Sequence, residues 1–195
     1  MINISKEKKA LFLDRDGILN HLVNKRPPWL ISEIKIYNEI FEILKLAKKS
    51  KYLPVVITNQ PDAGRGKLSY QKLYKIHERI MKILSIEISY VCTHPYDGMC
   101  DCRKPLAGSF YKAQRNNNID FQNSIMIGDR EKDIIPGKKV GCKTIKLSGE
   151  KSDLSDFNVR NHNELINLLR NLIWNKNNTK YSFDAIKKCI IYKIQ

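Results

Sequence analysis

Two carboxylates separated by one residue are the first candidate reactive groups of this chain: Asp14 and Asp16 follow the apolar run that ends at Leu13. Both cannot stay ionised side by side in a partly buried cleft unless a cation compensates them. Mg²⁺ suits such a pair, because it prefers oxygen ligands and keeps waters that a phosphate oxygen can replace. We expect Asp14 to attack phosphorus, and Asp16 to protonate the leaving oxygen and later deprotonate the water that hydrolyses the aspartyl phosphate.

Three later segments carry polar residues that complement this pair: Thr58-Asn59-Gln60, Arg103-Lys104 and Gly128-Asp129. A threonine hydroxyl and a lysine ammonium would hold the oxygens of a transferring phosphoryl group, by hydrogen bond and by charge. Asp129 would add a carboxylate to the Mg²⁺ site, and Asp133 lies one helical turn beyond it. An isolated Asp-x-Asp-Gly is usually a turn or a helix cap, so the catalytic interpretation depends on these other segments.

A second cluster has the ligand types of a zinc site, spaced Cys-x-His-x5-Cys-x-Cys: Cys92, His94, Cys100 and Cys102. Four protein ligands complete a tetrahedral set for Zn²⁺ and leave no open position, which predicts a structural ion. The alternatives are a surface loop with incidental cysteines and a zinc knuckle that grips nucleic acid, although the cluster contains no interleaved aromatic residue besides Tyr96. Because Cys102 directly precedes Arg103 and Lys104, a zinc-fixed loop would orient both cationic side chains.

The elements that must position these groups appear as alternating patterns along the chain. Buried strands are predicted where apolar, β-branched runs recur: Ala10–Leu13, Leu53–Thr58, Ile86–Cys92, Ser124–Ile127 and Cys142–Leu147. Amphipathic helices are predicted over 32–50, 69–84, 107–117, 131–140 and 163–174. Alternating strands and helices indicate an α/β fold with a mainly parallel sheet covered on both faces, in which ligands bind at the carboxyl ends of the strands.

Composition limits the class of protein. The 195 residues, 42% hydrophobic and 28% charged, fit one soluble catalytic domain, which we assign to 1–174 with the zinc loop at 92–102. Residues 175–195 are a tail of unknown role, and a monomer is favoured. The chain shows neither a signal peptide nor a membrane-length apolar run, so a cytoplasmic protein is expected. The net charge of +15 comes from lysines spread along the chain, which disfavours nucleic acid as a partner.

The reactive segments resemble the four motifs of the haloacid dehalogenase (HAD) superfamily, subfamily IIIA: Asp14-Arg15-Asp16-Gly17 with Asn20, Thr58-Asn59-Gln60, Cys102-Arg103-Lys104-Pro105 and Gly128-Asp129-Arg130. The resemblance covers residues 8 to 174 and implies a three-layer Rossmann-like fold with a minimal cap. It implies Asp14 as nucleophile, Asp16 as acid-base, and magnesium held by Asp14, Asp129 and the main-chain carbonyl of Asp16. It also implies that the phosphorylated substrate is bound by Thr58, Asn59, Gln60, Arg103 and Lys104.

Two clues to the substrate point to different members of this branch. The short spacing between His94 and Cys100 is similar to histidinol-phosphate phosphatases, whereas Thr58-Asn59-Gln60 with Arg65-Gly66 and His77 is similar to heptose-bisphosphate phosphatases. We favour removal of the 7-phosphate from D-glycero-D-manno-heptose 1,7-bisphosphate. A histidinol-phosphate phosphatase is the first alternative, and a polynucleotide 3′-phosphatase or a non-catalytic, basic, zinc-stabilised binding domain ranks below it.

Overall fold

The computed structural model describes residues 7–174, which form one six-stranded sheet in the order β3-β2-β1-β4-β5-β6. All neighbouring strands pair in parallel. The strands are β1 (Lys8–Leu13), β2 (Tyr52–Asn59), β3 (Ile88–Cys92), β4 (Ile119–Gly128), β5 (Lys143–Leu147) and β6 (Phe157–Val159). The first five confirm the strands predicted from apolar runs, whereas β6 was missed because three residues are too few for a periodic signal.

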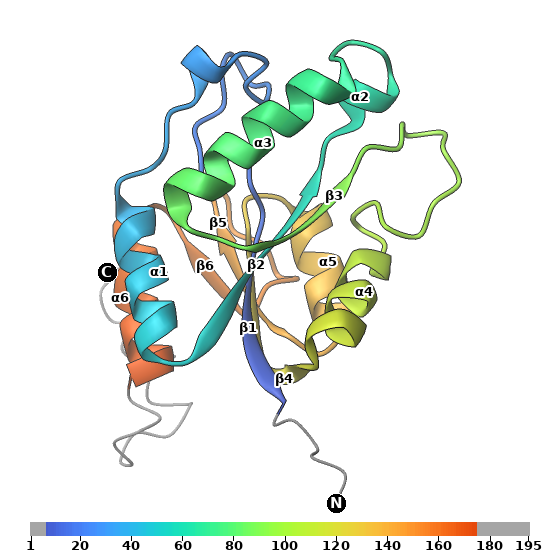
Figure 1. The fold of residues 1–195 in the computed structure, drawn as a ribbon. Coiled ribbons are helices and arrows are strands. Elements are labelled where there is room, and N and C mark those ends of the chain that lie inside the picture. The colour runs from blue at the N-terminus through green and yellow to red at the C-terminus, as the bar shows by residue number, and fades with distance from the viewer. Residues whose placement is uncertain (1–6, 175–195) are drawn as a thin grey trace, which may run out of the picture.

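Helices cover both faces of this sheet, so the three-layer prediction is confirmed (Figure 1). One layer holds α1, α3 and α6 and the other holds α4 and α5, while the short α2 lies at the carboxyl end of β2. The bounds are α1 (Glu39–Lys49), α2 (Pro61–Gly64), α3 (Tyr70–Leu84), α4 (Gly108–Asn117), α5 (Glu131–Lys139) and α6 (His162–Leu169), followed by a π-helical turn over Arg170–Trp174. None of the helices in the described range is both long and apolar enough to span a membrane.

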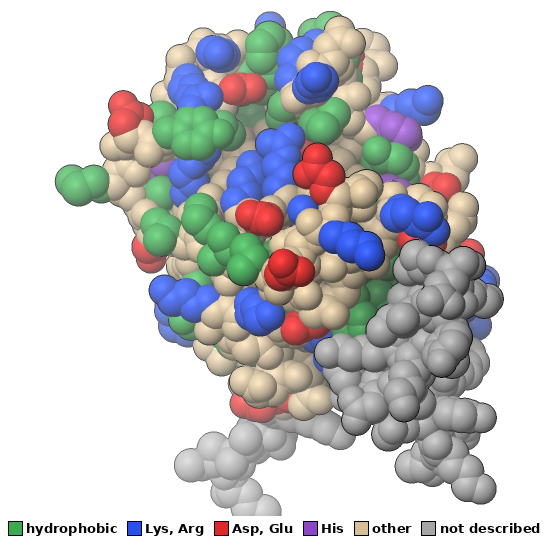
Figure 2. Space-filling model, turned by 180° about the vertical axis from the view of Figure 1, so that it is seen from behind, with side chains coloured by type: hydrophobic (Ala, Val, Ile, Leu, Met, Phe, Trp, Pro, Cys, Tyr) green, Lys and Arg blue, Asp and Glu red, His purple; other side chains and the backbone are tan. Residues whose placement is uncertain are grey.

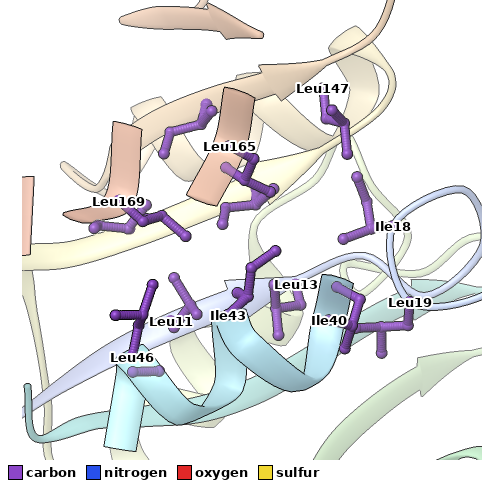
Figure 3. Packing of buried hydrophobic residues seen from close by; sticks show 14 of the residues in the cluster. Leu11, Leu13, Ile18, Leu19, Ile40, Ile43, Leu46, Leu147, Leu165 and Leu169 are labelled. Carbon is purple, nitrogen blue, oxygen red and sulfur yellow. The ribbon is translucent and has the colours of Figure 1, made fainter. Parts of the chain in front are cut away.

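The larger of the two main hydrophobic cores lies between the sheet and the α1/α3/α6 layer. Leu11 and Leu13 of β1 point into it, and Figure 3 shows Ile43 of α1 and Leu165 of α6 packed toward the same space. The other core, between the sheet and α4, is built around Phe12, whose ring centroid lies 4.9 Å from that of Phe110 with the two rings tilted to each other. Alternate residues of β1 therefore face opposite cores. Packing in both cores fixes the orientation of β1, and with it the position of Asp14 at its carboxyl end.

One predicted helix, 32–50, was wrong at its start, over 32–38. Helix α1 begins at Glu39, whereas the pattern had predicted helix from Ser32. Between these points the chain leaves a short 3-10 helix, Ile31–Glu33, and becomes extended. In the extended part the Tyr37 N–H donates to Leu19 O, and the His21 N–H donates to Lys35 O. Pairing with the segment that follows β1 thus overrides the local helical periodicity. The tail 175–195 lies outside the described residues.

The order of the strands reverses at β1. The chain runs outward from β1 through β2 to β3, then returns to the other side of β1 and continues through β4, β5 and β6. Crevices for ligands in such sheets open beside the switch point, at the carboxyl ends of the strands. Here the strands on either side of that point, β1 and β4, end next to Asp14 and Asp129, and the Asp14 N–H donates to Ile127 O at 3.0 Å.

Candidate active site and metal centres

The carboxylate of Asp14 lies against the ammonium of Lys104, with 2.6 Å between Oδ1 and Nζ. Lys104 is almost wholly buried, and its Nζ also lies 2.7 Å from Oδ1 of Asp133 and donates to Ile57 O. Burial lowers the pKa of Lys104, but Asp133 and Asp14 outweigh this and raise it above the ordinary value. Lys104 is therefore a permanent cation at the floor of the site.

The carboxylate of Asp16 is held in place by three side chains. The Arg15 guanidinium donates to both of its oxygens, Asn20 Nδ2 donates to Oδ1 at 3.0 Å, and Gln60 Nε2 donates to Oδ2 at 2.6 Å. Burial raises the pKa of Asp16, but Arg15, Asn20 and Gln60 together bring it below the usual value. These contacts favour the ionised form of Asp16, the form that accepts a proton.

Asp129 reaches the site because residue 17 has no side chain. Gly17 has a φ of +94°, and a Cβ there would lie 2.6 Å from Oδ2 of Asp129. Burial, and then the charges of Asp14 and Asp133, raise the pKa of Asp129 to about 7. The pKa of Asp14 is raised to about 6, because burial and the charges of Asp133 and Asp16 outweigh the opposing charge of Lys104. Holding both carboxylates ionised therefore favours a nearby cation.

The residues present fit a Mg²⁺ ion at this point. Oxygens of Asp14, Asp129 and Asp133 lie within 4.8 Å of one another, and carboxylate oxygens are the ligands that Mg²⁺ prefers. Both oxygens of Asp133 already have partners, because Oδ1 pairs with Lys104 and Oδ2 accepts the Arg130 N–H. Asp14 and Asp129 are thus the carboxylates best placed to ligate the ion, with Asp133 fixing Lys104.

The end of β2 connects the phosphate-binding candidates to one another. Thr58 is buried beside the site, and its Oγ1 accepts a hydrogen bond from Gln60 Nε2 at 2.9 Å. The Asn59 side chain pairs with the main chain of Lys104 in both directions, donating to its carbonyl and accepting from its N–H. Asn59 therefore fixes the main chain of Lys104 against the end of β2.

These residues open into one pocket of about 220 Å³. Six of the predicted site residues line it: Asp14, Asp16, Thr58, Asn59, Arg103 and Asp129. Gln60 and Lys104 are not among the lining residues and lie beneath it, in contact with Asp16 and Asp14 respectively. The pocket is also lined by cations that motif reading had not assigned to a catalytic role: Lys25, Arg26, Arg65, Arg130 and Lys132.

The cysteine cluster brings together all four predicted ligands. Its potential ligand atoms lie within 4.8 Å of one another, with the Sγ atoms of Cys92 and Cys100 3.9 Å apart and His94 Nδ1 3.5 and 3.3 Å from the Sγ atoms of Cys92 and Cys102. Tetrahedral zinc with ordinary bond lengths requires S···S separations of about 3.8 Å and S···N separations of about 3.5 Å. The donor set and its spacing therefore fit Zn²⁺.

Electrostatics inside this cluster also favour a cation. Burial, and then the neighbouring Cys92, raise the pKa of the Cys102 thiol to about 12. The cluster continues directly into the active site, since Arg103 follows Cys102 and donates from Nη1 to His94 O at 2.9 Å. The loop thereby holds Arg103 at the pocket.

Two functional contacts were missed by motif reading. Arg15 is fully buried as the partner of Asp16, and Asp133 is fully buried as the partner of Lys104. A charged residue between two carboxylates at a strand end was the available signal for Arg15. The signal for Asp133 was its place one helical turn after Asp129, at the start of α5.

Comparison with known proteins places the chain in a family. Residues 101–171 match the family model for HAD-hydrolase-like proteins. The D-glycero-α-D-manno-heptose-1,7-bisphosphate 7-phosphatase of Campylobacter jejuni is 32% identical over 169 residues, which cover 83% of this chain and 96% of that protein. The corresponding β-anomer enzyme of Helicobacter pylori strain 26695 is 31% identical over 171 residues, covering 83% and 98% of the two chains.

A solved structure gives the same fold. The D,D-heptose 1,7-bisphosphate phosphatase from B. bronchiseptica, complexed with magnesium and phosphate, superposes with a TM-score of 0.72 at 21% identity and covers 83% of this chain and 97% of that one. The likeness agrees with the parallel sheet and the helical layers described above. The chain is therefore a phosphatase of the haloacid dehalogenase superfamily, and belongs to the family that contains the heptose-1,7-bisphosphate 7-phosphatases.

Proposed function

We propose that this phosphatase removes the 7-phosphate of D-glycero-D-manno-heptose 1,7-bisphosphate, through an aspartyl phosphate on Asp14. The substrate is supported by relatives of that name that are more than 30% identical and align over nearly their whole length. The observation that carries the mechanism is the meeting of Asp14 with Lys104, Thr58 and Asp129 at the switch point of the sheet.

Asp14 is the proposed nucleophile. One of its carboxylate oxygens attacks phosphorus, the bond from phosphorus to the sugar oxygen breaks, and the phosphoryl group is transferred to Asp14. Lys104 and the Thr58 hydroxyl stabilise the negative charge on the transferring oxygens, and Lys104 does so without reorganising because Asp133 and Ile57 O already fix its ammonium. Mg²⁺ bound by Asp14, Asp129 and the main-chain carbonyl of Asp16 would neutralise the same charge.

Asp16 is the proposed acid-base. It gives a proton to the departing sugar oxygen, then takes one from the water that attacks the aspartyl phosphate, so that phosphate is released and Asp14 is regenerated. The hydrogen bonds from Arg15, Asn20 and Gln60 keep Asp16 in one orientation and favour the carboxylate needed for the second step. Gln60 is thus assigned to positioning Asp16.

The cluster of Cys92, His94, Cys100 and Cys102 is proposed to hold a structural Zn²⁺. Its role is to fix the loop that carries Arg103, whose guanidinium lines the pocket. A metal site closed by four protein ligands supplies rigidity and takes no part in the reaction.

The substrate is tested by kcat/KM on a panel: both anomers of heptose 1,7-bisphosphate, histidinol phosphate and a 3′-phosphorylated oligonucleotide. We expect one heptose anomer to exceed the other classes by about 100-fold or more, because discrimination resides in this ratio. A preference for histidinol phosphate would overturn the assignment. Equal hydrolysis of an aryl phosphate with Mg²⁺ by the wild type and Asp14→Asn would instead support a non-catalytic binding domain.

A further inference from the structure

Tyr96, in the loop after β3, carries two guanidinium groups over its ring. The Cζ atoms of Arg65 and Arg103 lie 4.2 and 3.9 Å from the ring centroid, although the Tyr96 side chain is 70% exposed. Two guanidinium groups repel each other, whereas the face of an aromatic ring attracts each of them. Arg103 is already held by its hydrogen bond to the His94 carbonyl. Tyr96 therefore fixes the position of Arg65 relative to Arg103.

The main chain before Arg65 is fixed against the same loop. Helix α2 ends at Gly64, and a Cβ at that position would lie 2.2 Å from the carbonyl oxygen of Thr93. No side chain fits in this contact, so glycine lets α2 pack directly on the chain that follows β3. Arg65 is thus held both at its backbone and at its guanidinium group.

In the described part of the chain, no carboxylate forms an ion pair with Arg65. Among the cations lining the pocket, Arg26 pairs with Glu33 at 2.6 Å and Arg130 lies 3.6 Å from Asp129. Within residues 7–174, the recorded ion pairs and hydrogen bonds give Arg65 no such partner. A guanidinium that is held in place but unpaired is suited to an anion from solution.

Arg65 and the proposed nucleophile lie at opposite depths of one pocket. Asp14 is 7% exposed and forms part of its floor, whereas Arg65 and Tyr96 are exposed at its rim. A substrate whose reacting phosphate contacts the floor would direct its distal end toward the rim. The residues at the rim therefore select among substrates by the chemical group at that distal end.

We propose that Arg65, positioned by Tyr96, binds a second phosphate monoester of the substrate, remote from the one that is hydrolysed. The inference rests on the proposed function and deepens it, since it assigns the 1-phosphate of a sugar bisphosphate to the rim of the pocket. Arg65 is a binding residue and Tyr96 a positioning residue. The enzyme accordingly discriminates a bisphosphate from the corresponding monophosphate through the contact of Arg65 with the second phosphate, away from the phosphate that reacts.

The test compares heptose 1,7-bisphosphate with heptose 7-phosphate, which differ only in the second phosphate. The ratio of interest is kcat/KM for the bisphosphate divided by kcat/KM for the 7-phosphate. For Arg65→Met we expect this ratio to fall about ten-fold or more, mainly through a higher KM for the bisphosphate. Tyr96→Leu should lower the ratio by about two- to five-fold, and Tyr96→Phe should restore it because the ring face is retained. Lys67→Met, an exposed cation outside the pocket lining, should leave the ratio unchanged.

The opposite result is equally definite. If Arg65→Met weakens both substrates by the same factor, or neither, Arg65 does not recognise the second phosphate. Wild-type enzyme that hydrolyses neither heptose compound but cleaves an aryl phosphate would refute the proposed substrate alone. The second-phosphate site would then be tested with fructose 1,6-bisphosphate against fructose 6-phosphate, where the absence of a wild-type preference would overturn it.

Discussion

The ammonium of Lys104 lies 2.6 Å from a carboxylate oxygen of Asp14, below the pocket. The same ammonium lies 2.7 Å from Asp133, which is fully buried. One cation therefore compensates two carboxylates that are far apart in the sequence, since Asp14 directly follows β1 and Asp133 lies on α5. The arrangement ties the stability of the fold to the chemistry of the site.

Removing this cation should destabilise the protein. Lys104→Met leaves the buried Asp133 carboxylate unpaired, and we expect the free energy of unfolding to fall by about 3 kcal/mol. Urea unfolding in the absence of divalent metal measures the change. The double variant Lys104→Met/Asp133→Asn should recover part of it, because the unpaired buried charge is then gone.

Lys138→Met is the matched control for that measurement. Lys138 lies on α5, is about half exposed and approaches Asp156 at 3.7 Å, so the change should stay within about 0.5 kcal/mol. A Lys104→Met variant as stable as Lys138→Met would show that the buried ion pair is not needed to offset the charge of Asp133.

Loss of zinc should lower activity while leaving the sheet intact. Cys100→Ser removes one of four ligands, and we expect bound zinc to be lost and kcat/KM to fall about ten-fold or more, because Arg103 loses its fixed loop. Metal content by mass spectrometry, circular dichroism and kinetics measure the three effects. Met99→Ser, at a fully exposed position in the same loop, should retain zinc and activity. Full activity in a zinc-free, folded Cys100→Ser protein would contradict the positioning role.

His77 should make stability depend on pH. It is buried on α3, with Nε2 2.9 Å from Ser89 Oγ, and burial, then the charge of Arg15, lower its pKa from 6.5 to about 4 against the opposing effect of Asp16. In the unfolded chain His77 therefore becomes protonated below about pH 6.5, whereas in the folded chain it becomes protonated only below about pH 4. Protonation favours unfolding in this window, so stability is full above pH 6.5 and is lost as the pH falls.

The magnitude can be isolated by substitution. Between pH 7.5 and 5.5 the wild type should lose roughly 1.3 kcal/mol more stability than His77→Gln, which does not titrate. Urea midpoints at the two pH values give the difference. Parallel pH dependence of the two proteins would mean that His77 is protonated in the folded state as readily as in the unfolded one.

The strand ends were the most predictable part of the site. Asp14, Thr58 and Asp129 each directly follow or end an apolar run, and parallel strands bring such positions to one rim, so their meeting followed from local pattern and one topological rule. The clustering of the four proposed zinc ligands was predictable for a similar reason, because they are closely spaced in the sequence.

Contacts that depend on tertiary packing could not be predicted in the same way. The extended segment before α1 has helical periodicity, and its pairing with the residues after β1 becomes visible only in the fold. The stacking of Arg65 on Tyr96 joins two residues far apart in the sequence, and the neighbours of neither residue give any sign of this partner. Long-range side-chain pairs of this kind leave no periodic trace.

The central claim is that Asp14 becomes phosphorylated during turnover. The direct measurement is rapid acid quenching of enzyme, Mg²⁺ and heptose 1,7-bisphosphate, followed by digestion and mass spectrometry of the peptide that contains Asp14. We predict one added phosphoryl group on that carboxylate within the first turnover, its accumulation in Asp16→Asn if breakdown is slowed more than formation, and its absence in Asp14→Asn. Turnover by a wild-type protein that never carries phosphate on Asp14, or undiminished turnover by Asp14→Asn, would contradict the account.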